Sequence, residues 1–207
     1  MKKTYGFALS LAFSVLVGVA ALGVGPASSA RGLAGMDAAI GQTIADFKLP
    51  DVDGKQHTLS SLKGKNGTVL IFISVNCPIS NAYNGRMEKL WQDYRARGVN
   101  LIGINSNVRE SAAAVRQHAA EHSLTFTILK DQDNKLADQL GAGRTPEVFF
   151  LDASNKLVYH GRIDNHRNVE MVQANDLRDA IDATLAGQPV TKTEASAFGC
   201  AIQRRAS

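Results

Sequence analysis

The segment that most constrains the fold is Thr68–Val75, whose sequence is TVLIFISV. It is almost wholly apolar and rich in β-branched side chains, a pattern typical of a strand buried on both faces of a parallel sheet. Asn76, Cys77 and Pro78 follow at once, and apolar and aromatic positions then recur at helical spacing over residues 80–97. The sequence therefore predicts a strand that leads directly into a helix, with a cysteine at the junction.

The rest of the chain predicts strands and helices in alternation. The expected strands are Val99–Ile104, Leu124–Leu129, Val148–Leu151 and Lys156–Tyr159, the expected helices are Glu110–His122, Lys135–Leu140 and Asp176–Ala186, and a hairpin of Phe47–Pro50 and Gln56–Leu59 precedes them all. Alternation of this kind implies a largely parallel sheet covered on both faces, to which the closing pair of strands adds antiparallel members. We therefore expect an α/β fold with a central mixed sheet flanked by helices and an N-terminal β-hairpin extension.

The first thirty residues have the three-part layout of a secretory signal. Lys2 and Lys3 open the chain, an apolar run extends over Phe7–Val24, and the small-residue patch Gly25–Ala30 follows. An uncleaved anchor is the alternative, because a run of about 18 residues is barely long enough to span a bilayer. We expect an exported protein, periplasmic or extracellular, that is membrane-bound only if this segment is retained.

Four parts are expected along the chain. Residues 1–30 form the signal peptide or anchor, residues 31–43 a mobile lead-in, residues 44–187 the folded domain, and residues 188–207 a tail without periodicity, read as flexible, that carries Cys200. Removing the first part takes away two lysines and no acid, so the net charge falls from +4 to about +2. No basic stripe with interleaved aromatic residues is visible, which argues against nucleic acid as a partner.

Cys77 is the first candidate for chemistry. The N-terminus of a helix presents free N–H groups and the positive end of the helix dipole, and both stabilise a thiolate. Pro78 lacks an N–H and therefore fits the first helical turn. The alternative is an inert buried cysteine, which is the commonest fate of a free thiol.

Thr145 and Pro146 precede an expected strand. Their peptide bond could be trans and ordinary, or cis, a form that is uncommon and usually selected for a tight turn. A cis bond would expose the backbone of Thr145 beside Cys77, where it could pair with a substrate peptide as an added strand does.

These features together resemble the thioredoxin superfamily: a buried strand, Cys-Pro at a helix start, and a distant Thr-Pro before a strand hairpin. The resemblance is closer to its redoxin branch, which holds peroxiredoxin-like (AhpC/TSA-like) and TlpA-like proteins, and it implies a thioredoxin-like fold and redox chemistry at Cys77. The motifs that carry it are Phe47–Lys55, Cys77-Pro78 with Tyr83 and Arg86, Thr145-Pro146-Glu147, Phe149–Asp152, Gly161–Asn165 and the terminal Phe198-Gly199-Cys200-Ala201-Ile202.

The sequence departs from this family at informative positions. A thioredoxin has Cys-x-x-Cys, whereas Ser80 stands here in place of the second cysteine. A peroxiredoxin has its reactive cysteine at the position of Ser80. It also has a proline seven residues before the position of Cys77, where this chain has Leu70. A hydroxyl cannot resolve a mixed disulfide, so Cys77 needs another thiol.

Cys200 is the other cysteine of the chain. The segment after Gly187 is long enough to reach about 40 Å when extended, so Cys200 could serve as the resolving thiol. The alternative is a permanent staple of the tail, which would stabilise the fold by roughly 4–5 kcal/mol in the chain-entropy description.

The remaining candidates have weaker support. Pro78 and Ser80 could support the thiol directly, and Arg144 and Arg162 could lie near it and lower its pKa. Glu147 could relay protons, although Arg86, Glu147 and both of the other arginines also suit ordinary surface or ion-pair roles. His118 and His122 lie four residues apart, as metal ligands on a helix do, but the sequence offers no third ligand. We expect no metal and no cofactor.

Three functions remain open from the sequence. The first is an exported thiol–disulfide oxidoreductase, with Cys77 and Cys200 as the reactive pair, Thr145–Pro146 as the substrate-orienting segment, protein thiols or disulfides as substrates, and an unidentified electron donor. The second is a peroxiredoxin-like peroxidase that reduces hydroperoxides. The third is a non-enzymatic or metal-carrying binding module.

Overall fold

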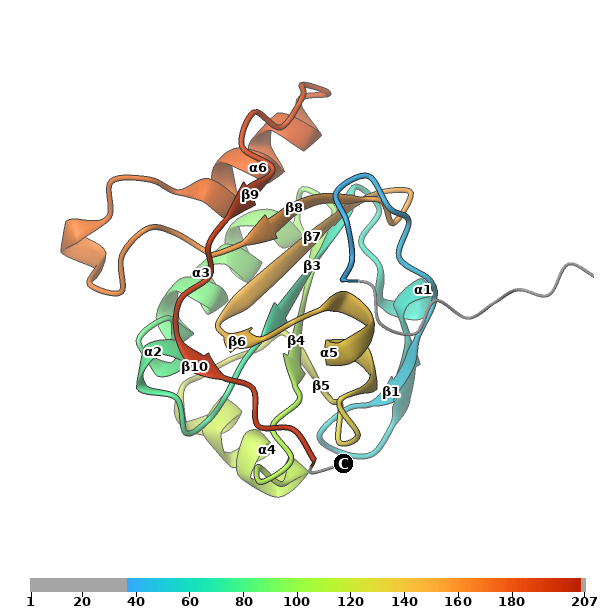
Figure 1. The fold of residues 1–207 in the computed structure, drawn as a ribbon, viewed down its shortest axis with the longest axis vertical. Helices are drawn as coiled ribbons and strands as arrows, with labels where there is room; N and C mark the ends of the chain where they lie inside the picture. The colour runs from blue at the N-terminus through green and yellow to red at the C-terminus, as the bar shows by residue number, and fades with distance from the viewer. Residues whose placement is uncertain (1–36, 206–207) are drawn as a thin grey trace, which may run out of the picture. The chain divides into compact units, whose positions relative to one another are not determined.

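The computed structural model describes residues 37–205, so the predicted signal over residues 1–30 lies outside the described part. A six-stranded sheet forms the centre, in the order β5-β4-β3-β7-β8-β9 (Figure 1). Its strands are β3 (Gly67–Phe72), β4 (Val99–Asn105), β5 (Thr127–Lys130), β7 (Glu147–Asp152), β8 (Leu157–Gly161) and β9 (Glu194–Ala195). Strands β3, β4 and β5 are parallel and β7 is antiparallel to its neighbours β3 and β8. The predicted α/β fold with a mixed sheet is confirmed.

Helices cover both faces of this sheet. They are α1 (Leu59–Leu62), α2 (Pro78–Asn81), α3 (Asn84–Arg95), α4 (Ala112–Glu121), α5 (Lys135–Leu140) and α6 (Asp176–Leu185). One apolar cluster joins the sheet to α3, α4 and α6, and a second joins it to α1 and α5.

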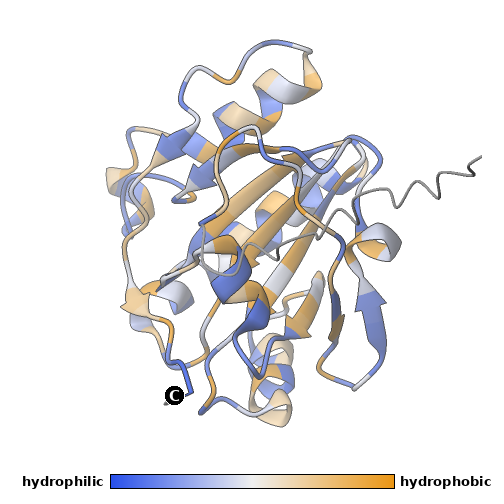
Figure 2. Cartoon of the chain, turned by 45° about the vertical axis from the view of Figure 1, so that its right-hand side comes forward, coloured by the Kyte–Doolittle hydropathy of each residue, from blue (hydrophilic) through white to orange (hydrophobic). Residues whose placement is uncertain are grey.

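The central strand β3 shows why the apolar run predicted this arrangement. Val69 and Ile71 belong to the first cluster, whereas Leu70 and Phe72 belong to the second, because successive side chains of a strand point to opposite faces. All six residues of β3 are buried, and the central strands are the most uniformly hydrophobic elements in Figure 2.

The N-terminal hairpin is present as predicted. It consists of β1 (Lys48–Pro50) and β2 (Gln56–Thr58), paired antiparallel and tied to the main sheet by a bridge between Asp51 and Leu129. The described part of the lead-in is packed, which differs from the expected mobile segment. Ala38 is buried in the second cluster, and the N–H groups of Ala38 and Gly41 donate to the carbonyls of Leu140 and Leu157, so contacts with the domain fix a segment that has no periodicity of its own.

Two boundaries near Cys77 differ from the prediction. Strand β3 ends at Phe72, which leaves residues 73–76 as a loop before the cysteine. The helix expected over 80–97 is two helices: the single turn α2 and then α3, with Ala82 and Tyr83 in the turn between them. Apolar positions on which the prediction was based are buried in the first cluster from the break onward, namely Tyr83, Met87, Leu90 and Tyr94.

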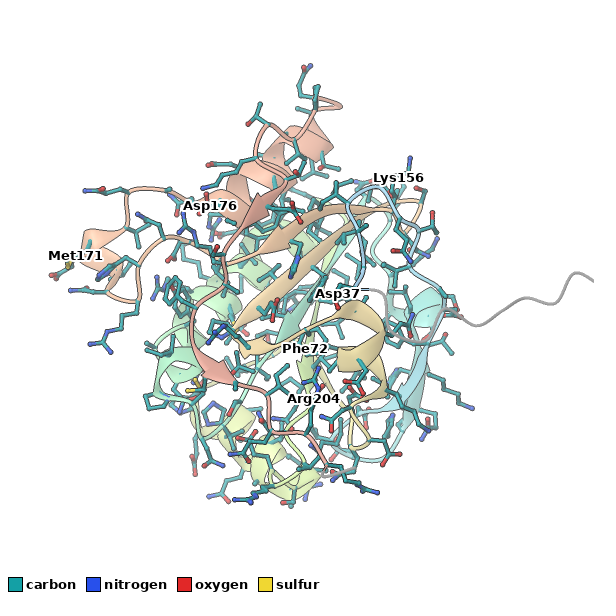
Figure 3. The ribbon with its side chains drawn as sticks, in the orientation of Figure 1. Asp37, Phe72, Lys156, Met171, Asp176 and Arg204 are labelled. Carbon is teal, nitrogen blue, oxygen red and sulfur yellow. The ribbon has the colours of Figure 1, made fainter. Side chains whose placement is uncertain are left out.

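A long loop between β8 and α6 contains a short 3-10 helix, η1 (Val169–Met171), that the sequence did not predict. Val169 and Met171 are exposed there, and Figure 3 shows Met171 at the outer end of the loop. Over residues 37–205, no helix is long and apolar enough to cross a membrane.

The C-terminal tail is docked, so the prediction of a flexible tail is wrong for the described residues up to 205. Strand β9 extends the main sheet, and β10 (Cys200–Ala201) pairs antiparallel with a short strand β6 (Arg144–Thr145). In Figure 1 the red tail crosses from β9 to the end of the sheet where α2 and β6 lie.

Candidate active site

Cys77 occupies the start of α2, at the C-terminal end of the central strand. It is the residue that caps this helix, and its sulfur accepts a hydrogen bond from the backbone N–H of Ser80 at 3.3 Å. Pro78 holds the first helical position, as predicted. The side chain is almost fully covered, since Cys77 is only 2% exposed.

The opposite wall of the site is the segment that leads into β7. The Thr145–Pro146 peptide bond is cis. The carbonyl oxygen of Thr145 lies 3.3 Å from the sulfur of Cys77 and accepts its thiol hydrogen. The structure therefore brings together Cys77, Thr145 and Pro146, three of the residues that the sequence singled out.

Cys200 completes this cluster. In the antiparallel register of β10 and β6, Cys200 stands opposite Thr145, and Ala201 stands opposite Arg144. Thr145 thus contacts Cys77 through its carbonyl oxygen and pairs with Cys200 through its backbone, and both cysteines are free thiols in this structure. Two thiols that lie far apart in the sequence are thus neighbours in space.

The two thiols differ in acidity in opposite directions. Burial opposes ionisation of Cys77, but hydrogen bonds from the Cys200 thiol and the Ser80 N–H outweigh it and hold the pKa of Cys77 below the ordinary value for a thiol. The pKa of Cys200 is raised, because its proton is engaged by Cys77 and because it is partly buried. Cys77 is therefore the thiol that ionises first, and the thiolate is the nucleophile in thiol chemistry.

Ser80 stands where a thioredoxin has its second cysteine. Its side chain is buried, and its hydroxyl accepts a hydrogen bond from the backbone N–H of Ser74 at 3.2 Å. Ser80 thus contacts the site twice, through its N–H to Cys77 and through its hydroxyl to the loop before Cys77.

Glu110 is a component of the site that sequence reasoning did not find. It precedes α4 and is buried, and its carboxylate accepts hydrogen bonds from the Ser74 hydroxyl (2.6 Å), the Val75 N–H (3.2 Å) and the Asn76 N–H (3.1 Å). These bonds replace the strand pairing that the loop before Cys77 lacks. They also outweigh the effect of burial and lower the pKa of Glu110, so it is a carboxylate at neutral pH.

A second layer holds Glu110 in turn. The side-chain amide of Asn105, at the end of β4, donates to the carboxylate at 2.5 Å. Lys130, buried at the end of β5, donates to the Asn105 side-chain oxygen and to the Asn107 carbonyl, each at 2.7 Å. The polar residues Asn105, Ser106 and Asn107 directly after a buried strand were the available sequence signal for this layer.

The arginines that the sequence proposed lie in different places. Arg144 is beside the site, where its guanidinium donates to the carbonyl of Gly199 at 3.1 Å and so contacts the tail. Arg162 forms an ion pair with Asp176 of α6 at 2.6 Å, so its charge is engaged there rather than with Cys77. Arg86 is also ion-paired, with Asp164 at 2.6 Å, and it stacks on the ring of Tyr83.

Glu147 supports the segment before it. One carboxylate oxygen accepts the backbone N–H groups of Gly143 and Arg144 at 2.7 and 2.8 Å, and the other lies 2.8 Å from the ring nitrogen of His160. The N–H bonds fix the loop that presents Thr145, so the geometry assigns Glu147 to that loop.

His118 and His122 lie side by side, with ring centroids 4.3 Å apart. His118 is buried and its Nε2 is 3.0 Å from the side-chain amide of Asn84, so this nitrogen has a protein partner. Within residues 37–205, no three His, Cys, Asp or Glu side chains are grouped as metal ligands.

Comparison with known proteins identifies a family for this chain. Residues 40–160 match the AhpC/TSA family, which is more than half of the chain. The thiol-disulfide oxidoreductase ResA of Geobacillus thermodenitrificans is 31% identical over 119 residues, which cover 58% of this chain and 67% of that protein.

Two solved structures are similar over most of the chain. The hypothetical protein SMc02350 from Sinorhizobium meliloti 1021 is 33% identical, with a TM-score of 0.77 over 84% of this chain and 98% of the other. An uncharacterized conserved protein from Geobacillus kaustophilus is 29% identical, with a TM-score of 0.76 over 82% and 94%.

The fold is thus thioredoxin-like, with a thiol at the helix start that follows the central strand. The chain belongs to the AhpC/TSA family of redoxins. The predicted thioredoxin-superfamily membership and the prediction of an oxidoreductase are confirmed.

Proposed function

We propose that this protein is an exported thiol–disulfide oxidoreductase in which Cys77 attacks the substrate and Cys200 resolves the mixed disulfide. One observation carries this proposal: strand β10 holds Cys200 opposite Thr145, the residue whose carbonyl oxygen accepts the thiol hydrogen of Cys77. The ResA relative is a thiol-disulfide oxidoreductase by name, which supports the same reaction class. Export rests on the N-terminal sequence, because residues 1–30 have the layout of a secretory signal.

The reaction with a disulfide substrate takes two exchanges. The Cys77 thiolate attacks one substrate sulfur, the substrate S–S bond breaks, and the other sulfur leaves as a thiolate that takes up a proton. Cys200 then gives up its proton and attacks the Cys77 sulfur, which releases the second substrate thiol. The Cys77–Cys200 disulfide now holds the oxidation that the substrate has lost, and an external dithiol donor returns the pair to thiols. The reverse sequence oxidises a substrate dithiol.

The acidity of the two thiols suits this division of roles. Cys77 has the lowered pKa and provides the attacking thiolate, whereas Cys200 keeps its proton until the mixed disulfide forms. Ser80 cannot resolve the mixed disulfide because a hydroxyl is not a useful nucleophile in disulfide exchange, so the distant thiol takes that part.

A peroxidase is the second candidate, and the match to the AhpC/TSA family supports it. The Cys77 thiolate would attack the O–O bond of a hydroperoxide, becoming a sulfenic acid as the alcohol or water leaves. Cys200 would then condense with the sulfenic acid, releasing water and forming the same disulfide. Because Ser80 and Leu70 depart from the peroxidase pattern, this reaction ranks second.

Single-cysteine variants test the proposal. With a small disulfide-bonded protein as substrate and dithiothreitol as donor, Cys77→Ser should lower the rate of substrate reduction to that of dithiothreitol alone. In a separate reaction of the reduced protein with the substrate and no dithiothreitol, Cys200→Ser should accumulate a mixed disulfide between Cys77 and the substrate, seen as a mass adduct under non-reducing conditions. Unchanged exchange by Cys77→Ser would refute the proposal. Rapid hydrogen peroxide consumption with stoichiometric disulfide formation would favour the peroxidase, and copper binding that needs Cys77, without either activity, would favour a carrier.

A further inference from the structure

The edge of the site that a substrate peptide would use is already occupied. Extended peptides bind to an exposed strand by adding main-chain hydrogen bonds to it. Beside Cys77 that strand is β6, and its partner is β10 of the same chain, in antiparallel register with Cys200 opposite Thr145. The tail thus takes the position of a substrate segment, with a cysteine at the place where a reacting sulfur would stand.

The tail approaches this edge so closely that only glycine fits before the cysteine. Gly199 has a φ of 148°, in the region that L side chains rarely adopt, and a Cβ there would overlap the carbonyl oxygen of Thr145. Arg144 holds the same residue from the side through its bond to the Gly199 carbonyl.

Contacts on both sides of Cys200 fix the strand. Before it, the ring of Phe198 packs edge-on against Tyr83, with centroids 6.2 Å apart. After it, Ile202 is buried in the second apolar cluster and its N–H donates to the carbonyl of Gly143 at 3.0 Å. Further along, Arg204 forms an ion pair with Asp138 of α5 at 2.9 Å.

These contacts are modest in size, which is what a displaceable strand requires. The ladder of β10 with β6 is two residues long, the apolar anchors are the two side chains of Phe198 and Ile202, and the Arg204–Asp138 pair is exposed. Short segments with few buried contacts open locally at much lower cost than the core of the domain.

We propose that residues 198–203 act as a displaceable strand that closes the peptide-binding edge of Thr145 and covers Cys77, and that a cysteine-bearing extended segment of a protein substrate takes its place. This inference rests on the proposed function and adds how the substrate gains entry. In the closed state Cys200 is poised to resolve, and the open state is the one that admits a substrate.

Cys200→Ser is the reference protein for the test, because it isolates the attack by Cys77. The probe is a short extended peptide whose cysteine carries thionitrobenzoate in a mixed disulfide. Attack by the Cys77 thiolate on the peptide sulfur breaks the S–S bond and releases coloured thionitrobenzoate, leaving the peptide on Cys77. Gly199→Val is then added to this background, since the new side chain cannot fit against Thr145.

We expect the Gly199→Val/Cys200→Ser protein to react about tenfold faster or more, because the rate scales with an open fraction that is about 0.1–10% in the reference protein. Ser196→Val/Cys200→Ser is the matched control. Ser196 is exposed in the same tail and makes no pairing with β6, so its rate should stay within about twofold of the reference. Ile202→Ala/Cys200→Ser loosens the anchor without strain at Gly199, so it should also react faster.

Competition separates a specific strand site from a simple cover. A synthetic peptide of residues 197–203 with serine in place of the cysteine should slow the Gly199→Val/Cys200→Ser protein, whereas the same peptide with valine in place of its glycine should not. Equal rates in the reference and both loosened variants, or equal inhibition by both peptides, would overturn the inference.

Alkylation of Cys77 by iodoacetamide distinguishes failure of the displaceable-strand inference from failure of the proposed exchange activity. Alkylation requires only that the reagent reach the Cys77 thiol and does not involve disulfide exchange. Faster alkylation in the loosened variants without any reaction with the peptide would support the strand as a cover and refute the exchange activity. Exchange at the same rate in all variants would uphold the activity and refute the displaceable strand.

Discussion

Replacement of Glu110 by glutamine should weaken the fold through the loop before Cys77. Each carboxylate oxygen faces only donors: the Ser74 hydroxyl and the Asn76 N–H on one, and the Val75 N–H and the Asn105 amide on the other. A glutamine keeps one acceptor oxygen. If its NH₂ group lies on the side of Ser74, the hydroxyl can accept from it but the Asn76 N–H loses its acceptor, and in the opposite orientation the NH₂ group meets the Val75 N–H and the Asn105 amide.

The cost follows from the bonds that are lost. Hydrogen bonds to a charged group contribute about 1.5–3 kcal/mol each, and a buried donor left without a partner costs about 1–3 kcal/mol. Losing one such bond in the better orientation should lower the free energy of unfolding by about 1.5–3 kcal/mol, which corresponds to a fall in Tm of about 3–12 °C for a domain of this size.

Urea unfolding followed by circular dichroism at pH 7 measures this loss. Glu121→Gln is the control, because Glu121 is exposed on α4 and accepts an exposed hydrogen bond from the side chain of Gln117, so its effect should stay within about 0.5 kcal/mol. A Glu110→Gln protein as stable as this control would refute the role assigned to the carboxylate.

The pH dependence gives an independent check on the same residue. The pKa of Glu110 is lowered in the folded protein, so its charged form contributes stability that is present above the unfolded pKa of about 4.3. That contribution is lost as the pH falls through the folded pKa. The difference in stability between wild type and Glu110→Gln should therefore shrink below about pH 4, whereas a difference independent of pH would contradict the account.

Two further predictions concern the thiols. The rate of Cys77 alkylation, followed by mass spectrometry of its peptide, should rise with pH, with a midpoint below the ordinary thiol pKa of about 8.5. Cys200→Ala should move this midpoint to higher pH because it removes a hydrogen bond to the thiolate. A midpoint unmoved by Cys200→Ala would contradict the pairing of the two thiols. Ser80→Cys in a Cys200→Ala background should restore turnover, because residues three apart at the start of a helix lie on the same side of it. A variant that still accumulates the mixed disulfide would show that position 80 is wrongly placed to resolve it.

The fold was predictable because its main signals are local and repetitive. The apolar run of β3 indicated a strand buried on both faces, and it lies at the centre of the sheet with both clusters packed against it. Helical spacing after Cys77 indicated the right faces, but it could not show the break at Tyr83, whose hydroxyl donates to Asp164 81 residues away.

The site was predictable only where one residue type carries the chemistry. Cys77 and the Thr145–Pro146 pair stand out in the sequence, whereas Glu110 looks like an ordinary acid at the start of a helix. Its role depends on the loop over 73–76, which is defined by contacts and not by periodicity. For the same reason Arg162, which the sequence proposed near the thiol, is paired with Asp176 instead.

The C-terminal tail shows most clearly which features the sequence could not predict. Residues 188–207 have no periodic pattern, and the prediction of a flexible segment followed from that absence. The structure fixes the tail up to residue 205 by main-chain pairing with β6 and by the apolar anchors Phe198 and Ile202, and neither leaves a repeating signal in the sequence. The motif around Gly199 and Cys200 marked the right place, but not the close contact with Thr145 that explains the glycine.

The most direct test of the central claim is the redox state of the Cys77–Cys200 pair in the mature protein. The protein would be equilibrated in a graded series of glutathione or dithiothreitol buffers, alkylated, and its two cysteine peptides quantified by mass spectrometry. The account predicts a reversible disulfide between these two residues with a potential above about −300 mV, as for working redox pairs. A bond that resists reduction throughout the series, or two thiols that never pair, would contradict it.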